Sequence, residues 1–157
     1  EDGNPSFKGV SRKKLFCEGS PAGIEVRYFE VEPGGHTTLE KHEHTHVVIP
    51  IRGKGFALVD KEVFEINCND VIYVPTWNWH QFRATEVDYL GFLCVVNVER
   101  DRPTLPTQSE IDEMKKDVEE SKAKKEKIAP EEMKVSEFDK FINLLYVAKT
   151  LSQVGPQ

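Results

Sequence analysis

The chain has 157 residues, of which 38% are hydrophobic and 31% are charged, and its formal net charge at pH 7 is −6. This length and composition predict one globular domain with room for an appendage. No apolar run approaches the ~20 residues of a membrane span, and no basic stripe offsets the negative charge, so we expect neither a membrane nor a nucleic acid as partner.

Cysteine usage bears on the cellular compartment. The three cysteines, Cys17, Cys68 and Cys94, are odd in number and include no CxxC pair. We therefore expect no disulfide framework and a reducing, cytoplasmic location. The first ten residues also lack the basic region and apolar stretch of a secretion signal. Cys94 lies in the apolar run GFLCVVN and is interpreted as a small buried residue.

In chain order, the sequence divides into four segments. Residues 1–22 form a mixed N-terminal segment in which KKLF is a candidate edge strand. Residues 23–100 contain short runs rich in β-branched and aromatic residues, separated by turns and without a helical pattern between them, which predicts a barrel or sandwich. Residues 101–108 form a proline-containing linker, and residues 109–157 form a helical extension.

The β region begins with the expected strand GIEVRYFEV, after which PGG at 33–35 is a turn signal. The other expected strands are HVVIPIRGKGFALVD, EVFEI, VIYVP, HQFRA and YLGFLCVVNV. In the extension, Ser109 with Asp112 three residues later is a candidate N-cap of a mostly charged helix. From about 131 to 152 apolar residues recur at helical spacing, and we expect their face to dock on the barrel or on a second subunit.

Histidines concentrate in EKHEHTH, residues 40–46, where Glu40, His42, His44 and His46 occupy alternate positions. Alternate side chains of a strand share one face. In a continuous strand, at ~3.3 Å per residue, His42 and His46 would be too far apart to share an ion. We therefore expect a tight turn at 43–45, after which His46 begins the next strand and faces His42. His44 is then a turn residue and a weaker candidate ligand.

A further ligand should come from the two remaining histidines. His36 follows PGG and is expected to be exposed, whereas His80 begins an apolar strand and is expected to point inward. Three imidazoles and one carboxylate suit Zn, Fe, Mn, Ni or Cu and leave a coordination position open. Two alternatives stay open: Glu40 faces the site without binding, or the barrel holds no metal.

The spacing around the cluster resembles the first signature motif of the cupin superfamily, which is Gly, five residues, His-x-His, three or four residues, Glu, six residues, Gly. Gly34, Glu40, His42, His46 and Gly53 keep every interval. Two residue types are exchanged, because Glu40 stands in the place of the first His and His46 in the place of the Glu.

The second cupin motif is Gly, five residues, Pro-x-Gly, two residues, His, three residues, Asn. Asn69, Pro75, Trp77, His80 and Ala84 keep its spacing, fifteen residues after the first motif. Asn69 and Trp77 replace glycines, and Ala84 replaces Asn. Asn tolerates left-handed backbone angles, whereas Trp77 adds a bulky ring near the barrel mouth.

This resemblance, to small cupins of the cupin-2 conserved-barrel type, covers about residues 23–100. It implies an all-β fold, the cupin double-stranded β-helix or jelly-roll barrel, followed by the C-terminal helical extension. It also implies a divalent transition metal held by Glu40, His42, His46 and His80. Family members usually pair as homodimers, and we expect the same of this chain because unpaired sheet edges are a liability.

Two functions from different classes remain open. The resemblance implies a metal-dependent enzyme of dioxygenase, decarboxylase, lyase or isomerase type that acts on a small polar molecule. The alternative is a non-catalytic module that binds or senses a small molecule or a metal. Arg27 and Arg83 could pair with a substrate carboxylate, although surface positions are the simpler interpretation. The candidate substrate-pocket residues are Trp77, Trp79, Phe82 and Tyr73, with barrel packing as the alternative for Phe82.

Overall fold

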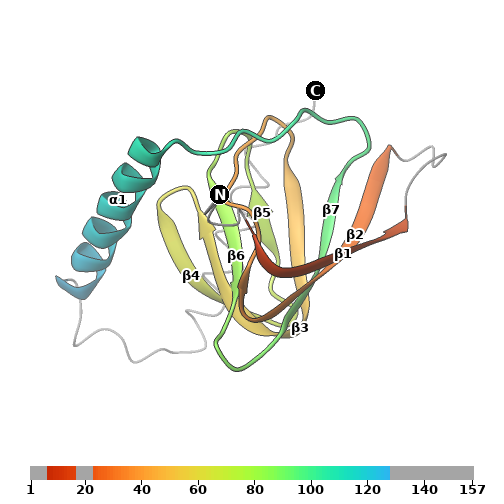
Figure 1. Ribbon diagram of the computed structural model, residues 1–157, viewed down its shortest axis with the longest axis horizontal. Helices are drawn as coiled ribbons and strands as arrows, with labels where there is room; N and C mark the ends of the chain where they lie inside the picture. The colour runs from red at the N-terminus through yellow and green to blue at the C-terminus, as the bar shows by residue number, and fades with distance from the viewer. Residues whose placement is uncertain (1–6, 17–22, 128–157) are drawn as a thin grey trace, which may run out of the picture. The chain divides into compact units, whose positions relative to one another are not determined.

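A computed structural model describes residues 7–16 and 23–127 of the chain (Figure 1). The elements in these ranges are β1 (Lys8–Phe16), β2 (Ile24–His36), β3 (His46–Val59), β4 (Glu62–Asn67), β5 (Ile72–Val74), β6 (His80–Ala84), β7 (Leu90–Asn97) and α1 (Gln108–Lys127). The chain divides into two compact units, Glu1–Val118 and Glu119–Gln157. The helix expected from about 131 to 152 lies outside the described residues.

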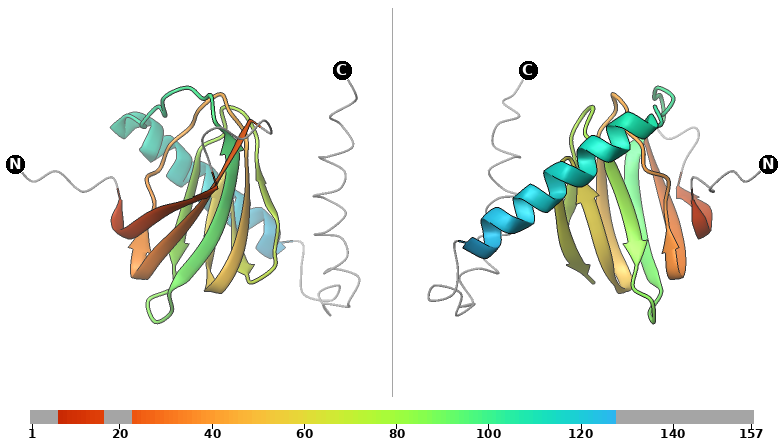
Figure 2. Two further views of the ribbon diagram at one scale, coloured as in Figure 1. Left: turned by 90° about the vertical axis from the view of Figure 1, so that its right-hand side faces the viewer. Right: turned by 60° about the vertical axis from the view of Figure 1, so that its left-hand side comes forward.

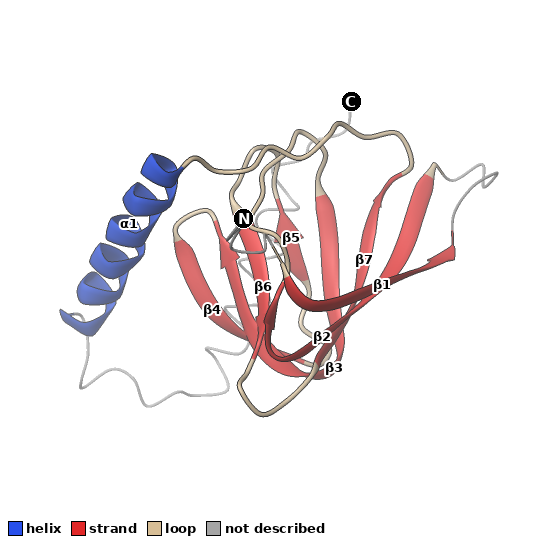
Figure 3. Cartoon of the chain, viewed as in Figure 1, coloured by secondary structure: helices blue, strands red, loops and turns tan. Residues whose placement is uncertain are grey.

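The strands close on themselves into the predicted barrel. β2 pairs with β7, β7 with β3, β3 with β6, and β6 with β2 through the single pair His36 and Arg83, all antiparallel. β1 adds to β2, while β4 and β5 add to β3. Figure 2 and Figure 3 show the strands curling around a common interior. The chain thus has the cupin barrel that its motifs implied.

The long strand β3 changes partners along its length. It pairs with β7 up to Gly53 and with β4 from Lys54 onward, and its register with β7 shifts between Pro50 and Arg52. Gly53 has a φ of 65°, and a Cβ there would lie 1.8 Å from the Tyr89 carbonyl oxygen. Only glycine can follow this path, which accounts for the glycine at the end of the first motif.

The barrel interior is filled by apolar side chains at alternate strand positions, as a half-buried strand requires. Three aromatic rings pack in series, because the Phe92 centroid lies 5.2 Å from that of Phe29 and 5.1 Å from that of Phe82. The buried hydrophobic residues are Val31, Val48, Ala57, Ile66, Ile72, Val74, Phe82, Ala84, Leu90, Phe92, Cys94 and Val96. This core supports the strand ends from which the histidines project.

Two expectations about the first strands need revision. KKLF is part of a longer strand, β1, which pairs with β2 from Lys8 to Phe16. PGG does not end β2, which continues to His36. Gly34, at a φ of 68°, donates its amide hydrogen to the Thr85 carbonyl at 2.8 Å. The glycines therefore carry the strand from β7 across to the β6 side instead of turning it back.

The predicted cap of the helix was also wrong. Thr107 is the cap: the Glu110 amide donates to its hydroxyl at 3.3 Å, and the Glu110 carboxylate accepts from the Thr107 amide at 2.9 Å, which is a capping box. The preceding linker is bonded to the barrel, since Lys41 and Thr104 exchange two backbone hydrogen bonds. Among the described residues, no helix is long and apolar enough to span a membrane.

Candidate metal centre

Three separate parts of the chain bring the site together. Glu40 and His42 lie on the segment between β2 and β3, His46 begins β3, and His80 begins β6. The backbones of Glu40 and His80 form an isolated antiparallel bridge, with N···O distances of 2.9 and 3.2 Å. The chain bends at residues 43–44, and this returns His46 toward His42, as the spacing predicted.

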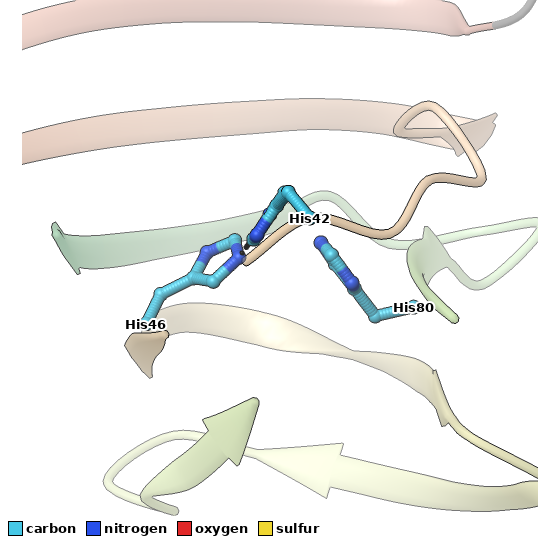
Figure 4. Close-up of side chains that lie close together, drawn as sticks. All are labelled: His42, His46 and His80. Atoms are coloured by element: carbon cyan, nitrogen blue, oxygen red, sulfur yellow. Dashed lines mark hydrogen bonds between the residues drawn. The ribbon is translucent and has the colours of Figure 1, made fainter. Parts of the chain in front are cut away.

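His42, His46 and His80 converge inside the barrel, and Figure 4 shows the three rings pointing toward one another. Their candidate ligand atoms all lie within 4.8 Å of each other, and all three residues are buried. The Nε2 atoms of His42 and His46 are 2.8 Å apart. The predicted convergence of distant histidines on one point is therefore present.

The other ring nitrogen of each histidine is held by the surrounding protein. His42 Nδ1–H donates to the His44 carbonyl at 2.7 Å, and His80 Nδ1–H donates to the Asn78 carbonyl at 2.9 Å. A carbonyl can only accept, so both rings carry their hydrogen on Nδ1 and present the Nε2 lone pair to the centre. His46 Nδ1 contacts Cys94 Sγ at 3.3 Å.

The protonation states also suit a cation. Burial lowers the pKa of all three imidazoles, that of His80 to about 4, so the rings are neutral at pH 7. Neutral imidazole is the form that binds metals. His80 Nε2 is buried and has no hydrogen-bond partner among the described residues. An unpaired buried acceptor costs free energy that a bound cation would recover, so this donor set fits a divalent transition metal.

Glu40 lies at the edge of this group rather than within it. Its Oε1 is 4.0 Å from His80 Nε2, and its side chain is 26% exposed. Burial raises the pKa of the carboxyl, while the charge of Arg27 opposes the rise. The carboxylate lies beside His80 Nε2 without a hydrogen bond to it, and its assignment as a metal ligand stays a prediction.

His44 and Asp101 form a second cluster against the first. The His44 ring stacks on His42 at 3.6 Å between centroids, and its Nδ1 lies 2.6 Å from Asp101 Oδ1. The amides of Glu43 and His44 donate to the same carboxylate at 2.8 and 3.1 Å. Partial burial alone would raise the pKa of Asp101, but these bonds hold that pKa well below its usual range. Asp101 thus fixes the bend that returns His46 to the site.

Two residues behind the histidines connect them to a buried charge. Cys94 is buried, as predicted, but its Sγ also lies 3.3 Å from Arg27 Nη2. The expectation that Arg27 is a surface residue was wrong, because it is 8% exposed. Arg83 is exposed, as expected. Alternation along β2 carried the missed signal: Arg27 shares a strand face with the buried Glu25 and Val31.

A cavity of about 290 Å³ reaches the centre, and Glu40, His42 and His46 form part of its wall. Its other walls come from β1, β2, residues 37–44 and the segment after β7. The lining residues outside the histidine cluster are Phe7, Val10, Arg12, Arg27, Phe29, Thr37, Thr38, Arg100, Asp101 and Pro103.

None of the four predicted pocket residues lines this cavity. Trp77 is 54% exposed, Lys41 Nζ lies 4.2 Å from the Trp79 ring centroid, Phe82 is in the core, and Tyr73 is partly buried on β5. The cavity is lined from β1, β2 and the segments around them, whereas these aromatics belong to β5, β6 and the turn between them. His36 also lies apart from the cluster: it is partly buried rather than exposed, and its Nδ1–H donates to the Thr37 carbonyl at 3.0 Å.

Comparisons with known proteins agree with this fold. The family model described as the cupin domain matches residues 27–96. The chain is 48% identical over 111 residues to 1-methylthio-D-xylulose 5-phosphate methylsulfurylase of Rhodospirillum rubrum, covering 71% of this chain and 70% of that protein. A crystal structure of a cupin-2 domain from the same organism superposes with a TM-score of 0.70 at 43% identity, covering 74% of this chain and 78% of the other. A cupin 2 conserved barrel protein from Rhodopseudomonas palustris superposes with a TM-score of 0.69 at 45% identity, covering 74% and 79%.

Proposed function

Because this chain belongs to the cupin domain family, we propose that it is a metal-dependent enzyme whose substrate is a small phosphorylated sugar bearing a methylthio group. The observation that carries the proposal is the buried cluster of His42, His46 and His80, which opens into a cavity in a chain 48% identical to a protein named as a methylsulfurylase. The cavity supports an enzyme over a purely structural metal site, which would have a closed shell.

The three histidines would hold a divalent transition metal, Zn, Fe, Mn, Ni or Cu, with Glu40 as the candidate fourth ligand. Such an ion, when bound with an open position, supplies Lewis-acid polarisation of a carbonyl or hydroxyl oxygen. A ketose phosphate presents both groups. The His44–Asp101 pair and the carbonyls of His44 and Asn78 hold the imidazoles in the required tautomer and orientation.

The remaining walls of the cavity match the other parts of such a substrate. Phe7, Val10 and Phe29 form an apolar wall against which a methylthio group can pack. Glu40, at the cavity wall with its Oε1 4.0 Å from His80 Nε2, has its carboxylate beside the centre, where it would complete the ligand set.

The test combines element analysis with turnover. The purified protein would be incubated with 1-methylthio-D-xylulose 5-phosphate, with and without a small thiol as acceptor, and mass spectrometry would follow loss of the methylthio group. We expect His42→Ala, His46→Ala and His80→Ala to lose both the metal and the turnover. His36→Ala is the matched control, because His36 lies outside the cluster, and it should keep both. A fully metal-loaded parent protein that binds this substrate without converting it would refute the enzyme and favour the binding module.

A further inference from the structure

We propose that Arg12, Arg27 and Arg100 form an anion subsite in the wall of the same cavity, and that the phosphate group of the substrate binds there. All three arginines line the cavity together with His42 and His46. The choice of phosphate rests on the proposed function, whereas the case for an anion rests on the arginines themselves. One molecule in the cavity would then be held at the metal centre and at the subsite together.

The arginines come from three parts of the chain. Arg12 lies on β1 opposite Phe29, and Arg27 lies on β2 opposite Lys14. Because strand side chains alternate, Val10, Arg12 and Lys14 share one face of β1, and both Val10 and Arg12 line the cavity. Arg100 follows β7, and its Nη1 donates to the carbonyls of residues 97 and 98 at 2.9 and 3.2 Å.

Positive charge exceeds negative charge in this wall and directly behind it. The buried carboxylate of Glu25 pairs with Lys14 at 3.0 Å, Arg100 at 3.1 Å and Arg27 at 3.6 Å. One carboxylate therefore serves three cations. Arg12 adds a fourth cation, and within the described residues it has no acidic partner. The two carboxylates that line the cavity itself have other neighbours: Asp101 is bonded to His44, and Glu40 lies beside His80.

Arg27 lacks the acceptors that a buried guanidinium requires. It is 8% exposed, its Nε has no hydrogen-bond partner in the described part of the chain, and its Nη2 donates to Cys94 Sγ, a weak acceptor. Arg27 is ion-paired with Glu25 at 3.6 Å, but a buried guanidinium also needs hydrogen bonds to its donors to offset the desolvation penalty. A bound anion would supply the missing acceptors to a side chain that already lines the cavity.

Phosphate is the anion that these residues suit best. A guanidinium presents its donors as a planar fork that matches the oxygens of a phosphate in pairs. A phosphate also has more acceptor oxygens than a carboxylate, so it can accept hydrogen bonds from more than one guanidinium at once. The name of the methylsulfurylase relative contains a sugar phosphate, and among the described residues no other arginine lines this cavity.

The experiment measures binding to the metal-loaded protein by calorimetry. The probes are D-xylulose 5-phosphate, the same sugar without phosphate, inorganic phosphate and acetate. Arg12→Gln removes a cation without breaking any bond described in the structure, and Arg27→Lys keeps the charge but removes the fork. Arg83→Gln is the matched control, since Arg83 is exposed on β6 and lies outside the cavity lining.

We expect Arg12→Gln and Arg27→Lys to weaken sugar phosphate binding at least about tenfold, which is about 1.4 kcal/mol, and to leave the unphosphorylated sugar and the metal content unchanged. Arg83→Gln should bind as the parent does. The subsite would be refuted if the parent and both variants bound the sugar phosphate equally well, or if the parent preferred the unphosphorylated sugar. Its specificity for phosphate would be refuted if acetate competed as strongly as inorganic phosphate. Binding requires no turnover, so an inactive parent with a phosphate preference would refute the proposed reaction and leave the subsite standing.

Discussion

Acid should destabilise the metal-free protein in a pH window set by its buried histidines. Burial lowers the pKa of His80 to about 4 in the folded protein, from 6.5 in the unfolded chain. Between these values the unfolded chain binds more protons, so the free energy of unfolding falls as the pH falls. The difference between 6.5 and 4, at about 1.36 kcal/mol per pH unit, amounts to about 3 kcal/mol from His80 alone. His42 and His46 act in the same direction.

The carboxylates affect the free energy of unfolding at a different pH from the histidines, so the two contributions can be distinguished. The pKa of Glu40 is raised by burial, so the folded protein takes up this proton first, and Glu40 opposes part of the loss. Burial alone would raise the pKa of Glu25, but its bond to Lys14 and the nearby charges lower it, as the bonds to Asp101 lower the pKa of that group. Stability from lowered carboxyl pKa values is lost only below the ordinary carboxyl range. The upper part of the window therefore reports on the histidines.

Urea unfolding with a chelator present, at a series of pH values between about 7 and 4.5, measures this loss. His80→Gln cannot take up the proton and should lose less stability than the parent across the window, by an amount approaching about 3 kcal/mol. His36→Gln, outside the cluster, should follow the parent. A His80→Gln variant with the same pH slope as the parent would refute the neutral, buried state of His80. A saturating metal at neutral pH should add stability, about 4 kcal/mol at a thousandfold excess over Kd, and the gain should shrink in acid as protons compete for the imidazoles.

Three further changes test the core, the bend and the candidate fourth ligand. Leu90→Ala, at a fully buried site, should lower the free energy of unfolding by about 2–5 kcal/mol, while Val87→Ala, 80% exposed, should change it by less than about 0.5 kcal/mol in the same denaturation assay. Asp101→Ala removes the acceptor of two backbone amides and the His44 ring, so thermal or urea unfolding should show a loss of about 1–3 kcal/mol. Glu40→Gln should weaken metal binding at least about tenfold in competition with a chromophoric chelator, and an unchanged affinity would leave the three histidines as the protein ligands.

Much of the fold was readable from the sequence because strands impose a period of two on their residues. The expected runs match β3, β4, β5, β6 and β7 closely. The wrong predictions are at positions where the local sequence is compatible with two structures. PGG is a turn signal, yet its glycines let β2 cross to β6, and Thr107 with Glu110 caps the helix two residues earlier than Ser109 would. Such choices depend on partners elsewhere in the fold.

The candidate site was predictable where spacing alone decides the geometry. The turn between His42 and His46 follows from the reach of a strand, and the structure brings His80 to them. Asp101 was missed because its partners, residues 43–44, are more than fifty positions away and no local pattern connects them. The aromatics around Trp77 were expected at the cavity because they flank His80, but the phenylalanines of its lining come instead from β2 and from the residue before β1.

The exchange of Glu and His relative to the first motif decides where negative charge lies in this barrel. His46 contacts Cys94, which in turn accepts from Arg27. A carboxylate at position 46 would stand close to that guanidinium and add a second negative charge beside it. With imidazole at 46 and the carboxylate at Glu40, beside His80, Arg27 keeps Glu25, at 3.6 Å, as its ion-pair partner among the described residues. The exchange therefore keeps the set of metal donors, and it adds no further carboxylate beside Arg27, the residue to which we assign a role in the proposed anion subsite.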